Sequence, residues 1–183
     1  MKKKGLALVL AMVLLVVGVA AGTLAWLTSR SDTVVNTFTT SNITVELKET
    51  TGATYKMVPG FEISKDPAVT VKAGSEDCYL FVKLEKSSNF DSFLTYVIAE
   101  NWTSLTGVDG VYYRVVRASS ADQSFEILKD DKVTVKGTVT KTMMTELTDM
   151  TLPKLTVSAY ASQLYKSAGV EFNPAEAWAN VNP

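Results

Sequence analysis

Apolar and polar residues alternate with a period of two along much of the chain, which is the pattern of half-buried β-strands. The clearest run places Cys78, Leu80, Val82 and Leu84 on one face. Further alternating stretches occupy residues 43–48, 69–72, 111–116, 133–139 and 155–160. They are rich in Val, Thr and aromatic residues, which strands favour. The pattern therefore predicts β-strands from near residue 43 to near residue 160.

Turn-forming clusters separate these strands. They contain Gly, Pro, Asp and Lys and lie at residues 58–60, 65–67, 73–77, 107–110 and 129–131. Many short alternating strands joined by such turns are typical of a β-sandwich or a jelly roll. We therefore expect a mainly β fold, a jelly roll or β-sandwich with a few short helices, preceded by an N-terminal signal helix.

Two short segments in the middle of the chain break the alternation. Residues 89–94 contain one helical turn in our prediction, with Asn89 as its cap. Residues 140–147 place Met143, Met144 and Leu147 at helical spacing. We expect the methionines to fill the core.

A third helical segment lies near the end of the chain. Asn173 suits the cap position, Pro174 the first helical position and Glu176 the third. Ala175, Trp178 and Ala179 would then form an apolar stripe that packs against the strands.

The N-terminus has the three parts of a secretory signal peptide: a basic start, an apolar stretch and small residues before a cut. Lys2, Lys3 and Lys4 precede residues 5–29, which carry no charge. Thr23 and Ala25 are small enough for cleavage between Ala25 and Trp26. This divides the chain into a signal peptide, residues 1–25, and a single β-sandwich (jelly-roll) domain, residues 26–183.

Three alternatives remain for this segment. Val19 and Ala21 offer an earlier cleavage site. The uncharged stretch also reaches the roughly 20 residues of a spanning helix, so it could stay as an uncleaved membrane anchor. A prepilin-type cut after Gly5 is disfavoured, because that class wants a Glu where this chain has Leu10. Apart from an uncleaved signal segment, nothing here predicts a membrane contact.

Charge and composition exclude several classes of function. The chain has 18 basic and 19 acidic residues; removal of the three N-terminal lysines leaves 15 basic residues and a mildly acidic domain. Such a balance argues against nucleic acid as a partner. The chain has no histidine, so it cannot build a Ser-His-Asp triad, a Cys-His pair or a His-based zinc site. We predict no enzymatic activity and no cofactor.

Other reactive residues have simpler interpretations. Cys78 is the only cysteine and is in phase with the apolar run, so we expect a buried core residue; an intermolecular disulfide is the alternative. Trp102, Tyr112 and Tyr113 could form a surface that stacks on carbohydrate, although aromatics at strand spacing more often fill a core.

The two ends of the chain resemble a known family. The residues concerned are 22–28 (GTLAWLT), 36–39 (NTFT), 43–47 (ITVEL), 155–161 (LTVSAYA) and 175–178 (AEAW). These blocks resemble the TasA/camelysin family, whose members are exported in Gram-positive bacteria by a SipW-type signal peptidase. The resemblance covers residues 1–47 and 153–179, and the middle of the chain agrees in strand pattern only.

The resemblance implies a secreted structural protein of the cell surface or biofilm matrix. In that family, fibres form when the N-terminal strand of one subunit fills a groove in the next, an example of β-augmentation. Here residues 26–47 would be the exchangeable strand, and its candidate side chains are Val35, Phe38, Ile43, Val45 and Leu47. The alternative is that residues 43–47 pair within their own domain.

The expected partners are a SipW-type signal peptidase, further copies of the chain, and other matrix or cell-surface proteins. The competing functional hypothesis is an extracellular binding module for cell-wall or matrix glycans. The peptidase label carried by camelysin has no support in a chain without histidine.

Overall fold

The structure, a computed structural model, describes residues 42–52 and 54–181, and these all lie in one compact unit, Thr40–Pro183. The expected signal segment, the Ala25–Trp26 cleavage site, Val35 and Phe38 lie outside the described residues.

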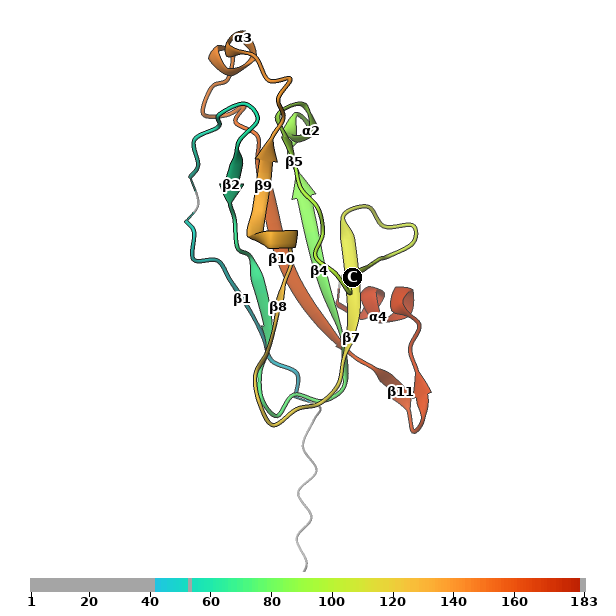
Figure 1. The fold of residues 1–183 in the computed structure, drawn as a ribbon. Coiled ribbons are helices and arrows are strands. Elements are labelled where there is room, and N and C mark those ends of the chain that lie inside the picture. Colours follow the sequence, from blue (N-terminus) through green and yellow to red (C-terminus); the bar gives the residue numbers. More distant parts are fainter. Residues whose placement is uncertain (1–41, 53, 182–183) are drawn as a thin grey trace, which may run out of the picture. The chain divides into compact units, whose positions relative to one another are not determined.

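Short strands dominate the described part of the chain (Figure 1). In chain order they are β1 (Val45–Lys48), β2 (Glu62–Ser64), β3 (Ala68–Val71), β4 (Cys78–Lys86), β5 (Leu94–Thr95), β6 (Thr103–Ser104), β7 (Val111–Val116), β8 (Gln123–Glu126), β9 (Lys132–Val135), β10 (Leu155–Gln163), β11 (Tyr165–Ser167) and β12 (Val170–Glu171). The helices are α2 (Phe90–Phe93), the 3₁₀ turn Lys129–Asp131, α3 (Lys141–Thr145) and α4 (Pro174–Val181).

The longest strands, β4 and β10, are neighbours in a four-stranded antiparallel sheet with the order β10-β4-β7-β6. Their nine residue pairs run in register from Leu155 opposite Lys86 to Gln163 opposite Cys78. β7 pairs with the other side of β4, and the short β6 closes that edge. β10 and β6 are therefore the two edges of this sheet.

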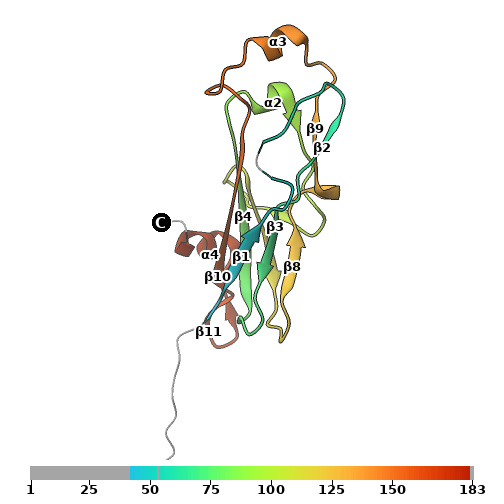
Figure 2. The ribbon, with the colours of Figure 1, turned by 90° about the vertical axis from the view of Figure 1, so that its left-hand side faces the viewer.

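Two three-stranded sheets, with the orders β1-β3-β8 and β2-β9-β5, lie across a shared core from the four-stranded sheet (Figure 2). β11 and β12 form a separate hairpin. At the turn into β7, the carbonyl of Gly110 accepts a hydrogen bond from Leu84 N at 2.8 Å. A Cβ at position 110 would lie 2.4 Å from Leu84 O, so only glycine fits there.

The main core takes its side chains from the facing sheets. From β4 it receives one alternating set, Cys78, Leu80, Val82 and Leu84. Facing these are buried residues of β3, β9 and the segments beside them: Val69, Val71, Ile127, Leu128, Val133 and Val135. The strand-period pattern of the sequence thus predicted this core face correctly.

A second core lies on the opposite face of β4. Tyr79 and Phe81 point there and pack with Val111 and Leu164 under helix α4. The ring of Trp178 lies 5.3 Å from Phe81, centroid to centroid. β4 is consequently buried on both faces, which explains why its apolar residues are almost continuous.

Helix α4 begins as the sequence predicted. Asn173 Oδ1 accepts a hydrogen bond from Glu176 N at 2.9 Å, and Glu176 Oε2 accepts one from Asn173 N at 3.0 Å. This reciprocal pair is a capping box. The predicted stripe was wrong in detail: Ala175 and Ala179 are exposed, whereas Ala177 and Trp178 are buried. The helix turns its Ala177 side inward so that the Trp178 ring can reach the second core.

The other two predicted helices are present. Thr140 caps α3 by accepting a hydrogen bond from Met143 N at 3.2 Å, and Met143 and Met144 pack on the core. Asn89 precedes α2, but its side chain does not cap it. Asn89 Nδ2 instead donates to Thr151 O at 2.7 Å, and Oδ1 accepts from Ser87 Oγ. The predicted cap position is confirmed, but the asparagine side chain ties the turn to the segment before β10 instead of bonding to the helix.

The expected fold class is confirmed at its coarser level: the described chain is mainly β, with antiparallel sheets and a few short helices. Strands β2, β5, β6, β8, β11 and β12 were not predicted. β2, β5, β6, β11 and β12 have only two or three residues, too few to show a period, and β8 has four residues of which one is apolar.

Candidate functional site

Strand β1 is the described part of the predicted donor strand. It lies at the edge of the sheet β1-β3-β8 and pairs antiparallel with β3, with Val45 opposite Val71. Ile43 and Val45 are half-buried against the main core, whereas the side chain of Leu47 is 36% exposed. Residues 45–48 thus pair within their own chain, the alternative that the sequence left open. Their exchange between copies stays a prediction.

The beginning of β1 is fixed to the turn between β3 and β4. Thr44 N donates to the buried Ser75 Oγ at 3.1 Å, and Lys72 N donates to Thr44 O at 2.9 Å. Glu76 N donates to Asn42 O at 3.2 Å. The chain therefore enters the described unit at the end marked by the β3–β4 turn.

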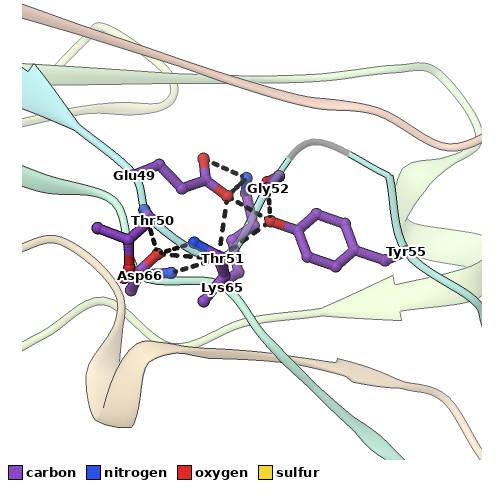
Figure 3. Close-up of polar contacts among 7 residues, drawn as sticks. All are labelled: Glu49, Thr50, Thr51, Gly52, Tyr55, Lys65 and Asp66. Atoms are coloured by element: carbon purple, nitrogen blue, oxygen red, sulfur yellow. Dashed lines mark hydrogen bonds and ion pairs between the residues drawn. The ribbon is translucent and has the colours of Figure 1, made fainter.

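The end of β1 is held by a cluster of polar contacts that we call the Asp66 clamp: Glu49, Thr50, Thr51, Gly52, Tyr55, Lys65 and Asp66 (Figure 3). Asp66 Oδ1 accepts hydrogen bonds from the backbone N–H groups of Thr50 and Thr51, both at 2.9 Å. The hydroxyls of the same two threonines also donate to this carboxylate. These donors favour the charged form, so they hold the pKa of Asp66 well below its usual value.

The second half of the clamp joins Glu49 to Lys65 and Tyr55. Lys65 Nζ lies 2.8 Å from both carboxylate oxygens of Glu49, and the Tyr55 hydroxyl donates to Glu49 and to the carbonyl of Gly52. Burial, and then the hydrogen bond to Glu49, raise the pKa of Tyr55. The cation facing Glu49 is thus Lys65, a residue of the chain itself.

An apolar groove of about 440 Å³ lies beside the clamp. One wall is the segment that carries Tyr55, Met57, Ile63 and Lys65; the other is residues 152–156, where β10 begins. The floor consists of core side chains, Phe90, Leu94 and Val133. Tyr55 and Lys65 belong to both features, so the clamp fixes one wall of the groove.

Unpaired strand edges border the groove. β10 pairs only with β4, and β2 pairs only with β9, within the described residues. Edges of this kind present N–H and C=O groups that another extended segment can use.

The groove and the chain entry lie at opposite ends of β4. The groove is next to α2, which follows the last residue of β4, whereas the entry is next to the turn that precedes Cys78. Figures 1 and 2 show α2 at one end of the unit and the β3–β4 turn at the other. A nine-residue strand makes this separation about 25–30 Å.

The aromatic residues considered for carbohydrate binding do not share one face. Tyr112 and Trp102 pack against the main core, whereas Tyr113 packs with Tyr79 and Phe81 in the second core. Neighbouring residues of a strand point to opposite sides, which explains this separation.

Cys78 is fully buried, as predicted, and burial raises the pKa of its thiol to about 11. No group of three or more Asp, Glu or Cys side chains within residues 42–52 and 54–181 is arranged to hold a metal ion. In the same residues, no helix has the length and hydropathy required to span a membrane.

Comparison with known proteins returned no matching family model, no matching curated protein and no matching solved structure. The resemblance described from the sequence therefore stays a prediction. The groove and the Asp66 clamp were not predicted, because their parts are separated in the sequence. Thr50-Thr51 and Asp66-Pro67 are residue types that are common in turns, so the sequence gives no sign that the two pairs lie together.

Proposed function

We propose that this chain is a secreted structural protein of the cell surface or biofilm matrix whose copies join head to tail. In this proposal a SipW-type signal peptidase cuts after Ala25, and residues 26–41 of one copy then enter the groove of the next. The mature fold is a jelly roll, and it has no catalytic role. The resemblance to the TasA/camelysin family supports the proposal, together with the arrangement of the described unit.

The observation that carries the proposal is the position of the groove relative to the chain entry. The entry at Asn42 and the groove beside α2 lie at opposite ends of β4. When identical subunits contact one another through two different surfaces, each added subunit leaves one surface free for the next. Such a contact forms a ring if the rotation between neighbours closes, and a filament if it does not. A donor at one end and an acceptor at the other make a contact of this kind, and copies in line along β4 would extend as a filament.

The chemistry of the groove suits an extended apolar segment. Its floor is apolar, and the edges of β10 and β2 offer backbone hydrogen bonds. Val35 and Phe38 supply apolar side chains within residues 26–41. We place residues before β1 in the groove because β1 already pairs with β3. Extended, these sixteen residues reach at most about 55 Å, enough to enter a neighbouring copy.

Electron microscopy of four proteins tests this proposal. The chain cut at Ala25 should form fibres. A version that begins at Asn42 should not, because it has no donor, and Met57→Arg should not, because a charge enters the groove. Val58→Arg is the matched control: Val58 is 48% exposed and does not line the groove, so its fibres should persist.

Fibres of unchanged abundance from the protein that begins at Asn42 would contradict the role of the N-terminal segment. N-terminal sequencing of the secreted protein tests the processing step separately. A mature chain that starts at Trp26 is expected, and one that starts at Met1 or Leu6 would remove the signal-peptidase step from the proposal.

A further inference from the structure

Arg114, on β7, lies between two aromatic rings on the side of the molecule away from the groove. Its guanidinium carbon is 3.9 Å from the ring centre of Phe125 on β8 and 5.4 Å from that of Trp102, just before β6. The indole Nε1–H of Trp102 donates to Glu126 O at 2.8 Å, which joins the β6 edge of one sheet to the β8 edge of another. The cation is therefore held between two side chains, one from β8 and one from the residue before β6.

This guanidinium has no acidic partner among the described residues. Its Nε–H is buried without a hydrogen-bond acceptor, and no carboxylate lies within ion-pair distance. Arg117, three residues further on, shows the usual arrangement: it contacts Asp77 at 2.9 Å, Glu171 at 3.3 Å and the Tyr165 hydroxyl. Burial without a counter-charge lowers the pKa of Arg114, whereas Asp77 raises that of Arg117.

A planar guanidinium that has no partner matches a carboxylate, which can accept two parallel N–H groups. The flanking rings keep water from its faces, so an arriving anion would interact more strongly than at an open surface. An unsatisfied buried donor in a folded protein also calls for an explanation.

Unpaired backbone beside Arg114 favours a peptide as the source of that carboxylate. β6 pairs with β7 only at Tyr112 and Tyr113, and the preceding residues 97–99 bond to residues 127–129 instead. Val115 and Val116 therefore have no partner on this edge within the described residues, and β8 pairs only with β3. An extended segment could add here through its main chain.

We propose that the β6–β8 side of this protein binds an extended acidic peptide segment of a partner protein, with one carboxylate seated on Arg114 between Trp102 and Phe125. This site is independent of the groove, since none of Trp102, Arg114 and Phe125 lines the groove and β10 lies at the opposite sheet edge from β6. An experiment that disproves peptide binding at Arg114 therefore does not disprove strand binding in the groove, and the reverse also holds.

Fluorescence anisotropy with labelled hexaglutamate and the processed protein tests the proposal at low ionic strength. Saturable binding is expected, weakened at least about tenfold in Arg114→Met, which keeps an apolar stem but loses the charge. Lys141→Met, at an exposed lysine of α3, should bind as the wild type does. Hexaglutamine should not bind, and added salt should weaken the hexaglutamate complex.

A second variant and a spectroscopic signal distinguish a loss of binding from a defect in folding. Arg114→Lys keeps the charge but loses the planar fork, so it should also bind more weakly. The Nε–H resonance of Arg114 should shift on titration in the wild-type protein. Equal binding by Arg114→Met, absent binding by the wild type, or Arg114-dependent binding of hexagalacturonate but not of hexaglutamate would overturn the proposal.

Discussion

Asp66 accepts hydrogen bonds from the backbone N–H and the hydroxyl of both Thr50 and Thr51, and it thereby joins two segments that are about fifteen residues apart. Its pKa is held low by the Thr50 hydroxyl and by the donors of Thr51. A carboxylate with a folded-state pKa below its unfolded value, about 3.9, stabilises the fold above that pH and loses the contribution as the pH falls further.

Asp66→Asn should therefore lower the thermal midpoint between pH 5 and 7 by an amount that shrinks below about pH 4. In that acidic range the wild type progressively loses the same charge. Melting curves from pH 7 to pH 2 measure the difference. Glu100→Gln, at an exposed residue, is the control and should show no such trend. A wild-type advantage that is undiminished at pH 2 would contradict the role of the charged carboxylate.

Cys78 gives a second prediction at the scale of a single residue. Its thiol is fully buried, and burial, with a smaller effect of the Asp77 charge, raises its pKa to about 11. The thiolate is the reactive form, so alkylation by iodoacetamide at pH 8 should be at least roughly a hundredfold slower in the native protein than in guanidinium. Mass spectrometry after timed quenching measures the rate of alkylation. Rapid labelling of the native chain would place Cys78 at the surface.

At the scale of an element, α4 depends on its capping box and on the second core. Asn173→Ala removes the cap that Glu176 N uses and should lower the free energy of unfolding by about 1 kcal/mol, whereas Asn173→Ser should restore most of it. Urea titration of the three proteins measures this. Equal stabilities of the alanine and wild-type proteins would mean that Trp178 packing alone determines the helix.

The sequence predicted the elements whose signals are local. β4 and β10 have nine residues each, long enough to show a period of two, and the start of α4 has a cap, a proline and a glutamate within residues 173–176. β8 could not be predicted, because its sequence QSFE has a single apolar residue. It is a strand because β3 supplies its hydrogen-bond partner.

The groove and the Arg114 site could not be predicted for a different reason. The walls of the groove come from residues 54–65 and 152–156, about ninety positions apart. Trp102, Arg114 and Phe125 meet only because β6, β7 and β8 are folded into two facing layers. Alternation predicts which side of a strand is buried, but it contains no information on which strands face each other.

At the scale of the whole molecule, the two ends of the unit should be separable by mutation. The protein that begins at Asn42 has a groove but no donor, whereas Met57→Arg has a donor but a blocked groove. An equimolar mixture should therefore form one-to-one dimers and no fibres. Size-exclusion chromatography with light scattering of each protein and of the mixture measures this, and a mixture that stays monomeric would contradict the head-to-tail arrangement.

β4 has a mechanical consequence in such a fibre. Tension between neighbouring copies would act from the chain entry to the groove, and hence along the axis of β4. Its hydrogen bonds to β7 and β10 run across that axis, so the force loads them in shear, all at once, instead of opening them one after another. The strand that separates the two cores would then carry the tension along the fibre.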